Sequence, residues 1–227
     1  MIITPSNSQD AIIPIWKPQM ITSTDIVRRI KSQFNFDKVG HCGTLDPFAE
    51  GVLVVLSGNK TSKSDHYMNS VKTYRTTIVF GKETDTLDRL GEIIRVDDSS
   101  NSFTEDDIRS VLIEFIGKIY QRPPSFSAKK INGVRLYKFA RKDIFIHLKP
   151  VLIEIEGIKF ISFRDNELTI EVTCHKGTYI RQLGSDIARK LGTFGYLKDL
   201  TRTSLGDFNL DNSFQLEDIE DWKFIHQ

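Results

Sequence analysis

Residues 40–58 read GHCGTLDPFAEGVLVVLSG, and this stretch decides how the chain folds. Its second half, residues 52–56, is a short apolar run between glycines, which is typical of a buried strand. Its first half is a glycine-punctuated loop in which Asp46 precedes Pro47, and a proline biases the residue before it away from helical geometry. The stretch therefore predicts a stiff acidic loop that leads into a central strand. The carboxylate of Asp46 is either a turn device, as in an Asx-turn, or a chemical reagent.

Apolar residues at helical spacing predict three helices. They cover residues 22–34, 104–117 and 179–192. Thr22 or Ser23 is expected to cap the first helix and Thr104 the second, because a short hydroxyl side chain accepts a hydrogen bond from an amide of the first turn. Gly117 and Gly192 are expected to end the second and third helices, since glycine tolerates the left-handed backbone that closes a helix.

Runs of β-branched and aromatic residues predict further strands. They cover residues 72–80, 151–163 and 167–174, with a hairpin turn at 164–166. Helices and strands do not alternate strictly, which favours an α/β or α+β fold with a mixed, largely antiparallel central sheet flanked by helices. We expect one domain over residues 1–227.

Composition limits the compartment and the class of protein. The 227 residues carry a net charge of +1 and contain no apolar run near the ~20 residues that a membrane helix needs. The N-terminus lacks the basic and apolar regions of a signal peptide, and two cysteines cannot build a disulfide framework. We therefore expect a cytoplasmic protein that has no metal site and no membrane role.

Basic residues are concentrated in one segment. Between residues 117 and 150 there are nine lysines and arginines but one acid, Asp143. Such a segment suits phosphates, although it can equally be a solvated surface. Within it, residues 121–142 contain two prolines and interleaved aromatic residues, which add a second ambiguity. The segment is either an arm that lies on a ligand or a long surface connection that ends in a short amphipathic helix.

Two further signals are ambiguous when taken alone. Tyr74, flanked by Lys72 and Arg75, is either a stacking platform for a nucleobase or a strand tyrosine in the core. Arg181, close to Tyr179 at the start of the third helix, is either a partner that keeps a nearby carboxylate ionised or half of a structural ion pair.

The motifs gain specificity as an ordered set. They are KP at residues 17–18, TS at 22–23, GHCGTLDPFAEGVL at 40–53, KTYR at 72–75, TDT at 84–86, PPSFSAKKINGVRLYKFAR at 123–141, CHKGTYIRQLGSDIARKLG at 174–192 and GYLKDLTRTSLG at 195–206. In this order they resemble the bacterial tRNA pseudouridine synthase B (TruB) family from residue 12 to about residue 220. The resemblance implies the pseudouridine synthase fold, with a basic thumb-like insertion at about 121–150.

The resemblance also implies roles for individual residues. Asp46 matches the catalytic aspartate, which either attacks C1′ of the target uridine or removes a proton from C2′; the sequence does not choose between these routes. Arg181 matches the salt-bridge partner of that aspartate. Tyr74 matches the tyrosine that stacks on the base and moves the C5 proton. The remaining substrate-binding positions are matched by His41, Tyr179 and Leu200.

The implied substrate is the T-loop uridine of elongator tRNAs at conventional position 55, which the enzyme must extrude from the T-arm. The implied isomerisation gains and loses no atoms, so no cofactor is expected. The basic insertion would close on the RNA, with backbone contacts from Lys129, Lys130, Arg135 and Arg141. The implied enzyme is a monomeric isomerase without an obligatory protein partner.

Some positions depart from the family pattern. Met20 stands where the family usually has a glycine, and Trp16 replaces a frequent aspartate. The chain stops where the family's catalytic domain finishes, so no C-terminal RNA-binding domain of the PUA type is expected. One alternative is a tRNA folding chaperone whose catalytic loop is idle. A small-molecule glycosidase is a second alternative, but most glycosidases need two carboxylates and the motifs offer one.

Overall fold

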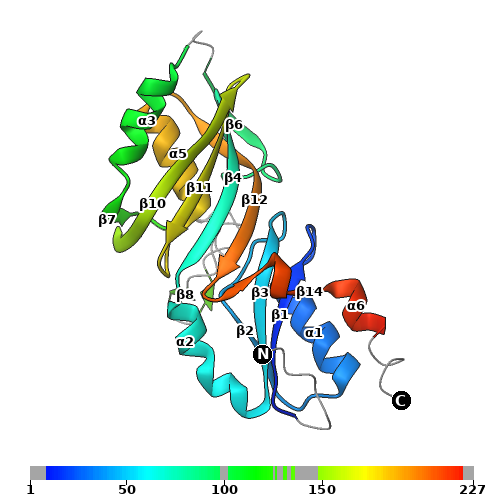
Figure 1. The fold of residues 1–227 in the computed structure, drawn as a ribbon. Helices are drawn as coiled ribbons and strands as arrows, with labels where there is room; N and C mark the ends of the chain where they lie inside the picture. The colour runs from blue at the N-terminus through cyan, green and yellow to red at the C-terminus, as the bar shows by residue number, and fades with distance from the viewer. Residues whose placement is uncertain are drawn as a thin grey trace. The chain divides into compact units, whose positions relative to one another are not determined.

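The protein is described here by a computed structural model, which covers residues 9–97, 102–124, 126, 130–131, 134–135 and 148–221. The chain divides into two units, one formed by residues 1–74 with 200–227 and the other by residues 75–199 (Figure 1). Within the described residues, no helix has the length and apolar character needed to cross a membrane.

The first unit is organised around the strand that the opening stretch predicts. This strand is β3 (Glu50–Ser57). It pairs antiparallel with β1 (Ile12–Lys17) and β2 (Val39–Cys42), and parallel with the end of β12 (Gly195–Leu205). Short strands β13 (Phe208–Asn209) and β14 (Phe214–Gln215) pair with β12 and β1. Successive β3 side chains enter opposite core clusters, because side chains alternate across a strand.

The first unit also holds most of the helices in the described part of the chain. They are α1 (Ser23–Phe34), η1 (Gly58–Lys63), α2 (Ser64–Asn69), η2 (Leu210–Asn212) and α6 (Leu216–Asp221). α1 and α6 lie side by side in Figure 1, and Ile26, Ile30, Leu216 and Ile219 join β1 and β3 in one apolar cluster. The predicted cap of α1 is confirmed at Thr22, whose side chain forms a capping box with Asp25.

The second unit contains the longer strands. Their order is β12, β4 (Lys72–Phe80), β11 (Glu167–Cys174), β10 (Val151–Arg164) and β7 (Gly117–Gln121). β10 pairs antiparallel with both neighbours. The predicted hairpin is confirmed at Asp165 and Asn166, whose φ angles of 51° and 61° are those a two-residue hairpin turn requires.

Shorter elements complete the second unit. They are the strand pairs β5 (Lys82–Thr84) with β6 (Ile93–Val96) and β8 (Lys130–Ile131) with β9 (Val134–Arg135), and the helices α3 (Glu105–Ile113) and α5 (Ile180–Lys190). α3 contacts both β10 and α5. The predicted architecture, a mixed and largely antiparallel sheet flanked by helices, is confirmed.

One predicted helix is shorter than its sequence pattern suggested. Residues 104–117 predicted a helix that Gly117 ends, but α3 stops at Ile113 and Phe115 lies in the following turn. Gly117, with φ of 96°, opens β7 and pairs with Ile155 of β10. The helix therefore ends early, because the chain must turn before Gly117 to place β7 beside β10.

Candidate active site

Asp46 lies in the first unit, in the loop between β2 and β3. Its carbonyl accepts a hydrogen bond from the amide of Ala49 at 3.1 Å, which closes a β-turn with Pro47 in the second position. Leu45 and Phe48 are buried, with 2% and 0% of their surfaces exposed, whereas Asp46 is partly exposed. The carboxylate therefore sits on a turn that is anchored by an apolar side chain on each side.

Ser23 holds the residue that precedes Asp46. Its hydroxyl donates to the carbonyl of Leu45 at 3.0 Å and accepts from the amide of Leu45 at 3.0 Å. Ser23 is 2% exposed, so water does not compete effectively for these bonds. The sequence left Thr22 and Ser23 as alternative helix caps. Because Thr22 is the cap, Ser23 is available to fix the loop.

Lys17 holds the other side of the loop. Its side chain is fully buried at the end of β1, and its ammonium group donates to the carbonyls of Ala49 at 2.6 Å, Pro18 at 2.8 Å and Ile21 at 2.8 Å. A fourth carbonyl, that of Pro47, lies 3.5 Å from the same ammonium nitrogen. A single ammonium thus ties the turn after β1 to the turn that carries Asp46.

The charge of Lys17 reflects its surroundings. The pKa of Lys17 is lowered to about 8, chiefly by burial and in smaller part by the positive charge of Arg202, while the negative charges of Asp46 and Glu50 act in the opposite sense. The four groups therefore share one electrostatic environment. It holds two buried cations and two carboxylates.

Met20 adds a backbone contact to the same junction. Its amide donates to the carbonyl of Pro47 at 2.7 Å, and its φ angle is 65°, in the left-handed region that favours glycine. The side chain is 62% exposed. The position that departs from the family's usual glycine therefore keeps the backbone conformation that glycine would adopt most easily.

Arg202 explains one of the glycines in the opening stretch, Gly51. It lies on β12, is 1% exposed, and donates from Nε to the carbonyl of Val52 at 2.6 Å and from Nη2 to the carbonyl of Gly43 at 3.2 Å. A Cβ at Gly51 would lie 2.3 Å from the carbonyl oxygen of Arg202, and Gly51 has φ of 116°. Arg202 therefore braces the loop at both ends, and only glycine fits against its backbone.

Three other predicted residues lie in the first unit. Tyr74, on β4, is 9% exposed, and its hydroxyl oxygen lies 3.5 Å from Nη1 of Arg202. Leu200, on β12, is 4% exposed. His41, on β2, pairs in register with Val55 and is partly buried. Of these three side chains, Tyr74 contacts Arg202, which also holds the loop that carries Asp46.

Arg181 lies in the second unit, in the first turn of α5, and is 5% exposed. Its Nη1 donates to the carbonyl of Thr86 at 2.7 Å and lies 3.6 Å from a carboxylate oxygen of Asp88. Its Nη2 donates to the carbonyl of Phe126 at 2.9 Å. Several contacts therefore hold the guanidinium group in one orientation.

Tyr179 is the N-cap residue of α5. Gln121, which is 2% exposed, accepts from the amide of Tyr179 at 2.8 Å and donates to its carbonyl at 3.1 Å. This reciprocal pair fixes the backbone of Tyr179 while its side chain remains partly exposed.

The predicted RNA-backbone residues are only partly covered. Lys129 and Arg141 lie outside the described residues. Lys130 and Arg135 pair in register across the β8–β9 hairpin, where the sequence predicted an arm or a connection with a short helix.

Sequence reasoning missed several residues that shape the site. Lys17, Ser23 and Arg202 all stand inside quoted motif blocks, so the blocks pointed to them without giving a role. Gln121 and Asp88 carried no signal, because nothing in a linear sequence indicates which carbonyl or amide a buried polar group will meet.

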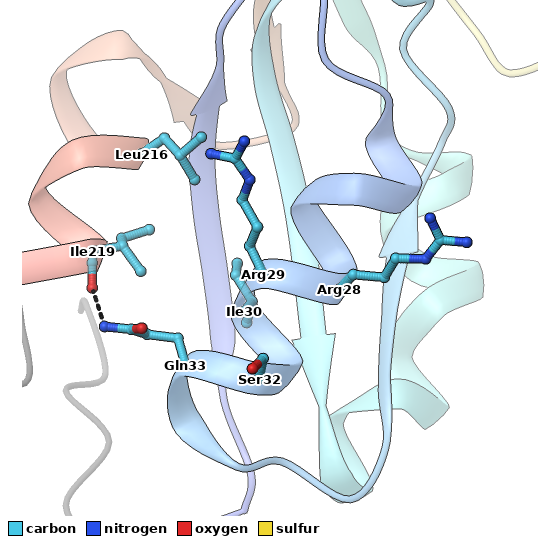
Figure 2. Close-up of a pocket in the computed structure, with 7 residues that line it drawn as sticks. All are labelled: Arg28, Arg29, Ile30, Ser32, Gln33, Leu216 and Ile219. Carbon is cyan, nitrogen blue, oxygen red and sulfur yellow. Dashed lines mark hydrogen bonds between the residues drawn. The ribbon is translucent and has the colours of Figure 1, made fainter.

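A surface pocket of about 580 Å³ lies elsewhere in the first unit, between α1 and α6. Its lining residues are Arg28, Arg29, Ile30, Ser32, Gln33, Leu216 and Ile219 (Figure 2). Gln33 donates to the carbonyl of Ile219 at 3.3 Å and joins the two helices. None of the predicted site residues lines this pocket.

Comparison with known proteins places these residues in a family context. Residues 31–180 match the family model described as TruB family pseudouridylate synthase (N terminal domain). Proteins named tRNA pseudouridine synthase B from Caldanaerobacter subterraneus subsp. tengcongensis and Clostridium tetani are 40% and 42% identical over 95% and 93% of this chain, which covers 76% and 73% of their lengths.

Solved structures give a related result. A chain from the crystal structure of a Cbf5-Nop10-Gar1 complex matches with a TM-score of 0.74 and 27% identity over 96% of this chain. This chain covers 55% of that longer one, about half its length.

Proposed function

The chain belongs to the TruB family of pseudouridylate synthases, and we propose that it is a tRNA pseudouridine synthase that isomerises uridine 55 in the T-loop of elongator tRNAs. The observation that carries the proposal is the Asp46 loop. Its backbone is held by Ser23 and Lys17, and its carboxylate is partly exposed. A fixed and accessible carboxylate is what either proposed route requires, since a reacting group must be positioned before the substrate arrives.

The reaction begins with cleavage of the bond between N1 and C1′. Asp46 either attacks C1′ to form a covalent sugar intermediate or removes the C2′ proton to form a glycal. The freed uracil then turns, and C5 forms a new bond to C1′. The C5 proton leaves and N1 gains a proton, so the product has the same atoms as the substrate. Tyr74 is the proposed base for the C5 proton.

Arg181 is proposed as the partner of Asp46. A guanidinium close to a carboxylate favours its ionised form and fixes its orientation. The contacts of Arg181 with Thr86, Phe126 and Asp88 support this role, because they would prevent the guanidinium from turning away. His41, Tyr179 and Leu200 are proposed to contact the extruded nucleotide.

We further propose that the enzyme is a cytoplasmic monomer that acts without an obligatory protein partner and without a cofactor. Residues 1–227 would form one catalytic domain, in which the segment at 121–150 closes on the T-arm. Lys129, Lys130, Arg135 and Arg141 would meet phosphates there.

Tritium release from tRNA transcript labelled at uridine C5 tests the function directly. The wild-type chain should release one tritium per tRNA, and changing uridine 55 to cytidine should abolish release. Asp46→Asn should bind tRNA with unchanged affinity and release none. Binding without release by the wild-type chain would instead support the folding-chaperone alternative, and release from tRNA that lacks uridine 55 would refute the proposed position.

A further inference from the structure

Arg202 is a buried cation for which the proposed reaction has so far named no role. It is 1% exposed and lies on β12, in the same unit as Asp46 and Tyr74. Its Nε and Nη2 donate to the carbonyls of Val52 and Gly43, which fixes the plane of the guanidinium. Nη1 is directed to Tyr74, with 3.5 Å between the nitrogen and the phenol oxygen.

The contact with Tyr74 has a definite polarity. A guanidinium has donors and no acceptor, so the phenol oxygen accepts from Arg202. A positive donor beside a phenol stabilises the phenolate more than the neutral phenol. The guanidinium carbon also lies 6.0 Å from the centre of the Tyr74 ring, within the range of a cation–π contact.

The surrounding charges make this effect stronger. Lys17 is fully buried in the same unit and is repelled by Arg202, which contributes to the lowered pKa of Lys17. Two buried cations of like sign disfavour one another, and a negative charge beside one of them offsets part of that cost. The Tyr74 hydroxyl lies beside Arg202, so its phenolate form would be next to one of these cations.

We propose that Arg202 is a positioning residue that holds the Tyr74 hydroxyl and stabilises the phenolate form that then accepts the C5 proton. This inference rests on the proposed function, because it assigns Arg202 to one step of that reaction. It also separates two tasks: the carbonyl contacts of Arg202 brace the Asp46 loop, and its Nη1 serves Tyr74.

A fluorine at C5 distinguishes the two tasks. In 5-fluorouridine there is no C5 proton to remove, so cleavage at C1′ and rejoining through C5 proceed without the step assigned to Tyr74. A variant that fails only in proton removal will be slow on uridine and normal on 5-fluorouridine. A variant with a displaced Asp46 loop will be slow on both.

The experiment compares single-turnover rates on tRNA that carries either base at position 55, followed by nuclease digestion and mass spectrometry. Arg202→Lys loses the carbonyl contacts with the loop as well as the contact with Tyr74, so both reactions should slow. Conversion of uridine should slow by about 100-fold more than consumption of 5-fluorouridine, the lower range for loss of general-base assistance. Arg28→Gln, at a side chain that is 75% exposed on α1, is the matched control and should leave both rates unchanged. Equal slowing on the two substrates would overturn the proposal and leave Arg202 as a brace for the loop.

A double-mutant cycle gives an independent readout. If Arg202 acts through the Tyr74 hydroxyl, Arg202→Lys should slow a Tyr74→Phe enzyme much less than it slows wild type, because only the loop contacts remain to be lost. Additive losses would contradict the proposal. If Arg202 variants fail to fold, the rates of Tyr74→Phe test the proposal instead. Equal slowing of this variant on uridine and on 5-fluorouridine would overturn the proposal, because Tyr74 would then have no proton-removal step for Arg202 to assist. A separate result would refute the proposed function: the wild-type enzyme would fail to convert uridine at all.

Discussion

The hydroxyl of Ser23 makes two hydrogen bonds to the backbone of Leu45, one to its carbonyl and one from its amide, each at 3.0 Å. The first residue of α1 thereby fixes the residue next to Asp46, which is more than twenty positions away in the sequence. The backbone beside Asp46 is therefore held by a contact that its own loop does not supply.

Ser23→Ala should lower turnover and stability together. The change leaves a buried amide and carbonyl of Leu45 unpaired, which costs about 1–3 kcal/mol, and it frees the backbone beside Asp46. We expect kcat to fall while KM changes little, because positioning rather than binding is lost. Ser32→Ala, at an exposed position of the same helix, is the control and should behave as wild type. Unchanged kcat in a destabilised Ser23→Ala protein would refute the positioning role.

Lys17→Met should change the pH dependence of stability. The pKa of Lys17 is lowered from 10.5 to about 8 in the folded chain, so between these values the unfolded state binds a proton that the folded state has released. Stability from this group therefore rises with pH across that window. Between pH 7 and 9.5, the free energy of unfolding of wild type should therefore rise by about 2 kcal/mol more than that of Lys17→Met, as measured by urea denaturation. The exposed control Lys38→Met should show no such difference, and parallel pH profiles for wild type and Lys17→Met would contradict the assignment.

Met20→Gly should raise stability slightly. Met20 has φ of 65°, and the left-handed conformation costs a residue with a Cβ about 1 kcal/mol of conformational free energy. Part of the gain is offset because glycine has more freedom in the unfolded chain. We expect an increase of up to about 1 kcal/mol in the free energy of unfolding. Met20→Ala keeps the Cβ and shortens the side chain, so it should show no increase; equal gains for both variants would exclude backbone strain as the cause.

Gln121→Ala should weaken substrate binding. Gln121 fixes the backbone of Tyr179 through two reciprocal hydrogen bonds, and Tyr179 is a proposed substrate contact. KM for tRNA should rise more than kcat falls. Gln121→Glu retains an acceptor for the amide of Tyr179 and loses the donor to its carbonyl, so its effect on KM should be intermediate. A larger KM effect for Gln121→Glu than for Gln121→Ala would mean that added charge, not backbone position, controls binding.

Replacing Lys129 and Lys130 with alanine should reduce the salt dependence of tRNA binding. Each phosphate contact contributes about 0.7–0.9 to the slope of log K against log salt, so the double variant should lose about 1.5 from that slope. The measurement is a filter-binding titration at several salt concentrations. An identical slope would mean that these lysines do not meet phosphate, and Lys38→Ala provides a surface lysine for comparison.

The fold was predicted well where local signals agreed with tertiary packing. The apolar run of β3, the Thr22 cap and the Asp165–Asn166 turn are all specified by neighbours in the sequence. α3 is the counterexample. Its helical pattern continues past Ile113, but Gly117 pairs with Ile155 of β10. This pairing depends on residues that are distant in the sequence, so the local helical pattern does not predict it.

The reactive roles assigned from the sequence remain predictions, and the contacts that support the Asp46 loop could not be predicted from the sequence. Asp46 carries a local signature, since a proline follows it and glycines flank its loop. The braces of that loop come from distant elements: Lys17 from β1, Ser23 from α1 and Arg202 from β12. The motif blocks include these three residues, but only the structure shows that each one forms a hydrogen bond with a particular carbonyl or amide.

The close approach of Gly51 to Arg202 also bears on how this chain can be re-engineered. A methyl group at position 51 would overlap the β12 backbone, so position 51 cannot be varied without separating two strands. A library aimed at new RNA targets should therefore keep position 51 constant and diversify position 20, whose side chain is 62% exposed beside the same loop.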